Sequence, residues 1–171
     1  MTARLLLACL LVGCAKVNPE ELEMRKAAKA RAEAVQAALV RGDFDAVADD
    51  THPRVVEELG GRGKMLATLA ATLDEMRAEG AEFRRVDVHD VTTLARAGKD
   101  VYVYVPIDVE MKVPGRLVRT RGGLIGVSPD GGKTWTFVDT SPGRAEIKRM
   151  IPELPDAIDI PAKGRPKVME D

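Results

Sequence analysis

The stretch Val101–Val113 reads VYVYVPIDVEMKV and alternates strictly between two kinds of residue. Every second position from Val101 onward is apolar, and the positions between hold tyrosine, proline or a charged residue. This alternation is typical of a β-strand with one face in the core and the other toward water or a partner. A straight strand of this length would run about 43 Å, far beyond the usual ~17–20 Å. Pro106 cannot donate to a ladder, so we expect a bent strand, with Pro106 at an edge or a bulge.

The spacing of apolar residues changes along the chain, from a helical period before residue 80 to alternation after it. Three helices are predicted first, at residues 19–40, 44–50 and 64–79. A turn that begins at Pro53 follows the second of them. Four strands follow, at residues 83–95, 101–113, 116–127 and 134–138, and then a short helix at residues 145–150. Segregated helices and strands indicate an α+β fold. We therefore expect three helices packed on a curved four-stranded antiparallel sheet with a short C-terminal helix, in one domain at 19–160 before a disordered tail at 161–171.

The N-terminal residues indicate where the protein is located. Arg4 precedes the apolar run Leu5–Val12, which is too short to span a bilayer as a helix and fits the apolar region of a signal peptide. Leu11-Val12-Gly13-Cys14 then resembles the lipobox of bacterial lipoproteins. The resemblance implies removal of residues 1–13, a lipid on Cys14, a tether at 14–18 and anchorage in a membrane of the cell envelope. Lysine rather than an acidic residue follows Ala15, which favours the outer membrane.

The cysteines have two alternative interpretations. The first is an ordinary secretory signal that contains a cysteine by chance. The second is a disulfide between Cys9 and Cys14, which we reject because Cys9 lies in the removed segment and Cys14 would carry the lipid.

The composition excludes some classes of partner. The formal net charge is −1 and the predicted domain contains no basic block, so the electrostatic footprint of a nucleic-acid-binding protein is missing. Aromatic residues make up 4% of the chain, which argues against stacking platforms for sugars or single strands. We therefore expect a core of aliphatic residues and no nucleic-acid partner.

The order of the elements resembles that of the nuclear transport factor 2-like superfamily, which has a cystatin-like α+β cone. The resemblance covers about residues 19–139 and is carried by Arg41-Gly42-Asp43-Phe44-Asp45, by His52-Pro53 before Gly60-Gly61, and by LIGVSPDGGKTWTFV at 124–138. The superfamily contains isomerases, dehydratases, cyclases and binding modules. The resemblance therefore implies a fold, and fold alone does not choose among these functions.

His52 is the best candidate for acid–base chemistry. It could form a carboxylate–imidazole pair with Asp49 or Asp50 at the mouth of the cone, or it could form a local hydrogen bond near Pro53. The inward face of the long strand is aliphatic, so it offers no group that moves a proton. His89 is expected on the surface of a strand. Two distant histidines without cysteine ligands predict no metal site, and no cofactor is predicted.

Two further sets of residues are candidates for a structural or a binding role. Ser128, Asp130, Gly132 and Trp135 resemble the Asp-box of sialidases, and we interpret this single copy as a structural hairpin. The outward positions of the long strand form a candidate interaction face that either dimerises or is solvated. The members of this face are Tyr102, Tyr104, Asp108 and Glu110.

These patterns favour a lipid-anchored envelope domain that binds a small apolar ligand or a protein partner without catalysis. One alternative is a small hydrolase or isomerase that uses His52 with a nearby carboxylate. Another is a structural domain that forms a homodimer through its sheet.

Overall fold

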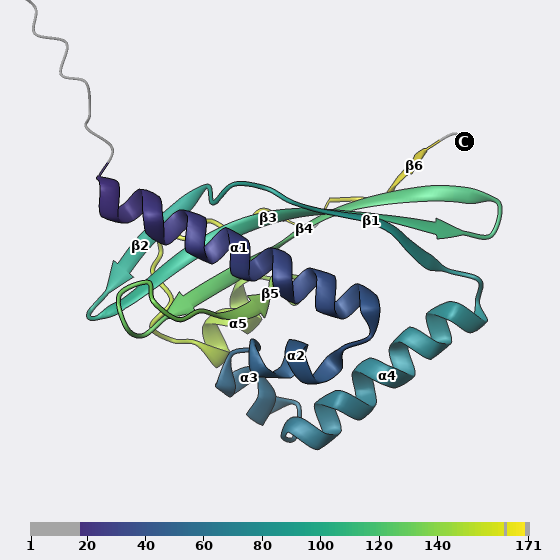
Figure 1. The fold of residues 1–171 in the computed structure, drawn as a ribbon, viewed down its shortest axis with the longest axis horizontal. Coiled ribbons are helices and arrows are strands. Elements are labelled where there is room, and N and C mark those ends of the chain that lie inside the picture. The colour runs from purple at the N-terminus through teal and green to yellow at the C-terminus, as the bar shows by residue number, and fades with distance from the viewer. Residues whose placement is uncertain (1–17, 163, 170–171) are drawn as a thin grey trace, which may run out of the picture.

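The computed structural model describes residues 18–162 and 164–169, which form an α+β structure with one open antiparallel sheet (Figure 1). Four helices precede the sheet: α1 (Pro19–Arg41), α2 (Phe44–Asp49), α3 (Pro53–Glu58) and α4 (Arg62–Ala78). The strands are β1 (Glu82–Val88), β2 (Thr93–Ala97), β3 (Asp100–Val113), β4 (Arg116–Ser128), β5 (Thr136–Asp139) and β6 (Lys167–Met169). Helix α5 (Arg144–Met150) lies between β5 and β6 in the sequence. Within the described residues, no helix is both long and apolar enough to cross a membrane.

Helix α1 begins and ends as its sequence predicts. The side chain of Asn18 accepts a hydrogen bond from the Glu20 N–H (3.1 Å), and Pro19 occupies the first turn, where its missing N–H costs nothing. Gly42 ends the helix in a left-handed conformation (φ 77°), and its N–H donates to the Leu39 carbonyl (3.0 Å).

The sheet is built around β3, which pairs with β4 along its whole length, from Val101 opposite Ser128 to Val113 opposite Arg116. On its other side, β3 pairs with β1 over one half and with β2 over the other. Strand β4 likewise pairs with β5 at one end and β6 at the other. The sheet therefore has six strands rather than the four expected from the sequence.

The expected strand at 83–95 is divided into β1 and β2 at the position of Pro106. The His89 N–H donates to the Pro106 carbonyl (2.9 Å), but Pro106 has no N–H to return the bond. The ladder stops there and resumes where the Thr92 N–H donates to the Tyr104 carbonyl (3.1 Å). Pro106 itself lies within the central strand β3, paired with Gly123 of β4. The edge or bulge expected at Pro106 is instead a break in the neighbouring strand, between β1 and β2.

Both faces of β3 are buried over residues 101–105, and this corrects, for that half of the strand, the expectation that one face meets water or a partner. Val101, Val103 and Val105 pack against α1, where the small side chains of Ala28 and Ala32 allow close approach. Tyr102 and Tyr104, on the opposite face, are only 2% and 5% exposed. Figure 1 shows α1 crossing one face of the sheet and α5 behind it. The tyrosine face is covered by Ile147, Ile151, Leu154 and Ile158.

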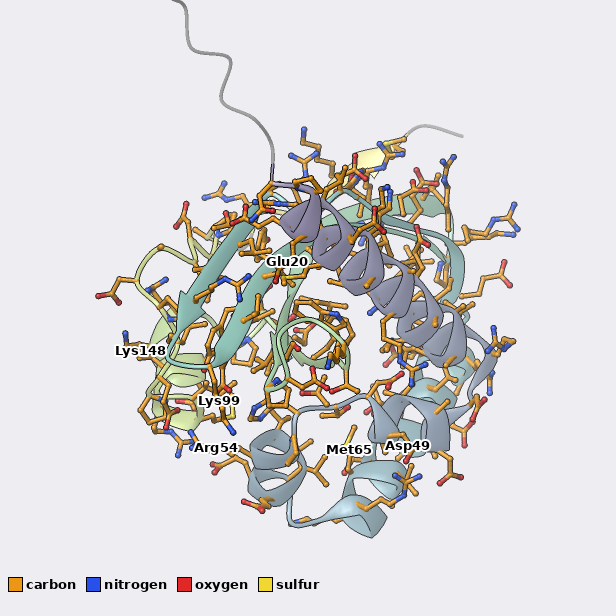
Figure 2. The ribbon with its side chains drawn as sticks, turned by 60° about the vertical axis from the view of Figure 1, so that its left-hand side comes forward. Glu20, Asp49, Arg54, Met65, Lys99 and Lys148 are labelled. Carbon is orange, nitrogen blue, oxygen red and sulfur yellow. The ribbon has the colours of Figure 1, made fainter. Side chains whose placement is uncertain are left out.

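A third, smaller core joins the helices that precede the sheet. Met65 of α4 packs with Val47 and Ala48 of α2 and with Ala38 of α1 (Figure 2). The turn at Pro53 forms helix α3, so four helices rather than three precede the sheet. The disordered tail expected at 161–171 is also corrected in part, because residues 167–169 pair with β4 as β6.

Candidate functional site

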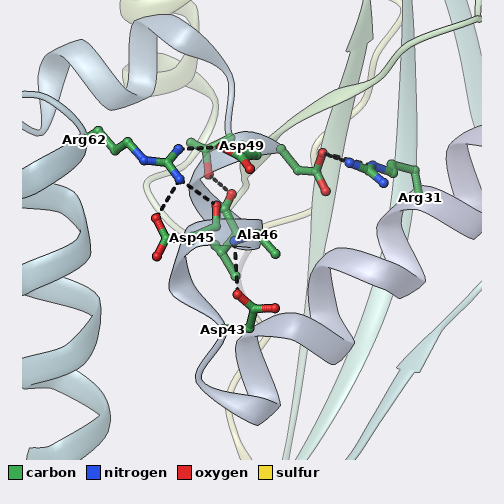
Figure 3. A network of polar contacts seen from close by, with 9 residues as sticks. Arg31, Asp43, Asp45, Ala46, Asp49 and Arg62 are labelled. Carbon is green, nitrogen blue, oxygen red and sulfur yellow. Dashed lines mark hydrogen bonds and ion pairs between the residues drawn. The ribbon is translucent and has the colours of Figure 1, made fainter.

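The structure does not pair His52 with Asp49 or Asp50. Asp50, 8% exposed at its side chain, accepts hydrogen bonds from Arg31 Nε (2.9 Å) and Nη2 (2.5 Å). Asp49 accepts a hydrogen bond from Arg62 (2.5 Å), and Figure 3 shows Arg62 between α2 and α4 with Arg31 on the far side. In the part of the chain that the structure describes, no hydrogen bond or ion pair joins His52 to either carboxylate. The candidate catalytic carboxylates are therefore held by arginines from α1 and α4.

His52 forms the local hydrogen bond near Pro53 that was the alternative prediction for this residue. Its Nδ1 accepts a hydrogen bond from the Arg54 N–H (3.3 Å) and so caps α3. Its backbone N–H donates to the Phe137 carbonyl (2.9 Å), and the Phe137 N–H donates to the Asp50 carbonyl (2.7 Å). This pairing fixes the segment between α2 and α3 against β5. Burial, followed by the positive charge of Arg54, lowers the pKa of His52, so its imidazole stays neutral and able to accept.

The Asp-box residues form one hydrogen-bonded hairpin between β4 and β5. Ser128 Oγ donates to Asp130 Oδ1 (2.8 Å), which also accepts the N–H groups of Lys133 (3.1 Å) and Thr134 (2.9 Å). Oδ2 accepts the Thr134 hydroxyl (2.7 Å), and these bonds lower the pKa of Asp130 to about 2. Trp135 Nε1 donates to the Gly132 carbonyl (3.0 Å) while its ring is buried. The network holds the turn and uses every polar group that the motif supplies.

The candidate interaction face divides into two parts with different surroundings. Tyr102 and Tyr104 are covered by the protein's own C-terminal segment and are not available to a partner. Asp108 accepts a hydrogen bond from Arg121 Nε (3.0 Å) and lies 3.3 Å from His89 Nε2. The hydrogen bond from Arg121 is the main cause that lowers the pKa of Asp108.

Glu110, the other acidic member of this face, is paired with Arg119 on β4 (Nε to Oε1, 3.0 Å). Sequence reasoning did not join these acids to their partners. The signal was present, because Arg119 and Arg121 alternate on β4 opposite Glu110 and Asp108 in an antiparallel register.

The structure contains an apolar groove that sequence reasoning missed, between the second half of α1 and strand β1. Its volume is about 570 Å³, within the usual range for small-molecule sites. Val40 in its wall is 38% exposed, which is unusual for a large apolar side chain in this protein. The apolar lining consists of Ala37, Val40, Phe83, Val86 and Val88.

A β-bulge at Arg84 makes this groove apolar. Phe83 pairs with Met111 and Val86 pairs with Val109, so the register shifts by one residue between them. In a regular strand Phe83 and Val86 would point to opposite faces, because side chains alternate with a period of two. The extra residue places Phe83, Val86 and Val88 on the same face, beside α1. In the sequence, the bulge is indicated only by the irregular spacing of the apolar residues around Arg84-Arg85.

Two further cavities are less suited to an apolar ligand than this groove, one because its lining is more polar and the other because it contains an ion pair. One of about 480 Å³ lies beside Tyr104, Arg121 and Thr140. The other, of about 560 Å³, includes Arg31 and Asp50, whose charges neutralise each other. Among the residues that the structure describes, no group of three or more His, Cys, Asp or Glu side chains could hold a metal ion.

Comparison with known proteins gives no family assignment. No protein-family model matches the chain, and no curated protein matches its sequence. The protein is therefore characterised by its α+β architecture and by the groove between α1 and β1.

Proposed function

We propose that this protein is a lipid-anchored domain of the bacterial cell envelope that binds a small apolar ligand in the groove between α1 and β1, without catalysis. The groove carries the proposal, because it combines five apolar side chains in its lining with a volume suited to a small molecule. The contacts of the candidate acid–base residues also support it. His52 caps α3, and Asp50 is paired with Arg31.

The proposed fold family is the nuclear transport factor 2-like superfamily. The order of helices before an antiparallel sheet supports it. Helix α1 covers the centre of the sheet, because its residues Ala28 and Ala32 pack directly on β3. A ligand would therefore bind beside the sheet, at β1, rather than in the middle of a cone.

The proposed anchor is the lipid on Cys14, which lies outside the described residues, as do the signal peptide at 1–13 and the tether as far as residue 17. Its support is the sequence from Arg4 to Cys14. The variant Cys14→Ser should move the protein from the membrane fraction to the soluble fraction, and it should no longer incorporate a labelled fatty acid. A Cys14→Ser protein that stays in the membrane fraction would contradict the anchor. Separation of the two membranes tests the expected location in the outer one.

Ligand binding can be tested with a neutral apolar probe, 1-decanol, titrated by calorimetry into the full chain carrying Cys14→Ser. Ala37→Trp places a large ring in the groove and should abolish binding. Ala30→Trp is the matched control, because Ala30 is exposed on the same helix but lines a different cavity. Equal binding by both variants, or no binding by the parent protein, would contradict the proposed site.

A further inference from the structure

The groove between α1 and β1 has positive charge at one end. Arg41 is the last residue of α1, and Arg84 lies at the bulge near the start of β1. Both belong to the end where α1 finishes and β1 begins, whereas Glu33 and Val88 belong to the other end (Figure 1). The groove therefore has two arginines at one end and Glu33 at the other, with apolar side chains along the walls between them.

These two arginines are weakly engaged by the protein itself. In the described part of the chain, no ion pair joins Arg41 to a carboxylate, and Arg84 lies 3.8 Å from Glu82 Oε1. The other charged groups of the lining have partners, since Arg85 is paired with Asp87 (2.7 Å) and Glu33 lies 4.0 Å from Lys29. Guanidinium groups bind carboxylates through strong charge-assisted hydrogen bonds. Arg41 is thus the group of this groove that is free to hold an anion, and Arg84, with one long contact to Glu82 at 3.8 Å, is placed to share it.

The groove as a whole has the length of a short acyl chain. Residues 33 to 41 of α1 span about 12 Å at ~1.5 Å per residue. Residues 83 to 88 of β1 span about 17 Å at ~3.3 Å per residue. A chain lying along them would contact Ala37 and Val40 on one side and Val86 and Val88 on the other.

We infer that the ligand is a single-chain carboxylate of medium length, with its head group at Arg41 and Arg84 and its acyl chain along the apolar walls. The inference rests on the proposed function and deepens it by naming the class of ligand. A neutral chain would leave Arg41 without an anion, and a cationic head group would be repelled by both arginines. Partly exposed charges also predict that binding weakens as salt is added.

The test compares three probes with the same ten-carbon chain: decanoate, 1-decanol and decyltrimethylammonium. Each is titrated by calorimetry into the full chain carrying Cys14→Ser, below its micelle concentration. Decanoate should bind about tenfold or more tightly than 1-decanol, since a hydrogen bond to a charged group contributes about that ratio. Decyltrimethylammonium should bind most weakly, and sodium chloride should weaken decanoate alone.

Two arginine variants identify the head-group site. Arg41→Gln and Arg84→Gln should each weaken decanoate binding several-fold and leave 1-decanol binding unchanged. Arg77→Gln is the matched control, because Arg77 is an exposed residue near the end of α4 and does not line the groove. It should change neither affinity.

The outcomes separate this inference from the proposed function. Equal binding of decanoate and 1-decanol, unaffected by both arginine variants, would overturn the anionic ligand and leave the apolar site in place. If none of the three probes binds, both proposals fail. If sedimentation shows a dimer that Ala37→Trp converts to a monomer, the groove is covered by a second copy of the chain, and the inference is overturned.

Discussion

Gly123 of β4 lies directly beneath the ring of Tyr104 of β3, so close that a Cβ at Gly123 would lie 2.4 Å from Tyr104 Oη. The ring can take this position only because the neighbouring strand has no side chain there. Tyr104 Oη also reaches the Gly122 carbonyl, to which it donates at 3.4 Å. The glycine pair in β4 is thus part of the packing of the core on the tyrosine face of the sheet.

Gly123→Ala should destabilise the protein by about 1–3 kcal/mol, since the buried ring of Tyr104 has to move. Gly122→Ala is the matched control, because a Cβ at Gly122 would meet no atom within 4 Å, and it should stay within about 0.5 kcal/mol of the parent. Urea denaturation measures both. In a Tyr104→Val background the cost of Gly123→Ala should shrink. An equal cost in the two backgrounds would show that the ring is not the cause.

Leu154→Ala should lower the free energy of unfolding by about 2–5 kcal/mol, because Leu154 is 1% exposed over the tyrosine face of the sheet. Leu59→Ala is the same substitution at a residue that is 41% exposed, and it should cost much less. Similar costs for the two variants would mean that the C-terminal segment does not cover the sheet in solution.

Protonation of Asp130 should lower the stability of the protein in strong acid. Its pKa is lowered from 3.8 to about 2 in the folded state, so the unfolded chain takes up the proton first as the pH falls. The stabilisation by the Asp130 carboxylate is complete above pH 3.8 and is lost as the pH falls through about 2. Thermal unfolding of Asp130→Asn should therefore differ most from the parent above pH 4 and converge with it near pH 2. Asp74→Asn, at an exposed carboxylate, controls for the loss of one charge. A constant difference for Asp130→Asn across this range would contradict the assignment.

His52 should give a second pH dependence at milder acidity. Its pKa is lowered in the folded state by burial and by Arg54, so protonation favours the unfolded chain. The stability that depends on neutral His52 is present above pH 6.5 and is lost as the pH falls below that value. His52→Asn keeps a side chain that can cap α3 but does not titrate. The parent should lose thermal stability relative to His52→Asn between pH 8 and pH 5. Parallel curves would show that His52 titrates as it does in the unfolded chain.

Much of the architecture could be predicted because it depends on local patterns. The alternation in Val101–Val113 identified β3, and Asn18 and Gly42 marked the ends of α1. The cover on the tyrosine face could not be predicted in the same way. Ile151, Leu154 and Ile158 lie in a segment interrupted by proline, whose apolar residues show no strand or helix period that assigns them to a face.

The candidate site was harder to predict because it depends on contacts between distant residues. Asp49 and Asp50 adjoin His52 in sequence, yet arginines 13 and 19 positions away bind them. The groove depends on a register shift at Arg84, and such a shift becomes visible only when β1 is paired with β3.

The position in the sequence of the residues that cover the tyrosine face has a consequence for biosynthesis. Ile151, Leu154 and Ile158 follow strands β1 to β5 and precede only the short strand β6, so they are the last buried core residues to leave the ribosome or a translocation channel. Until they emerge, Tyr102 and Tyr104 remain uncovered on a sheet that already has five of its six strands. The domain therefore finishes folding only after nearly all of its chain has been released, and a nascent chain stalled before Ile151 would offer this aromatic face to a chaperone.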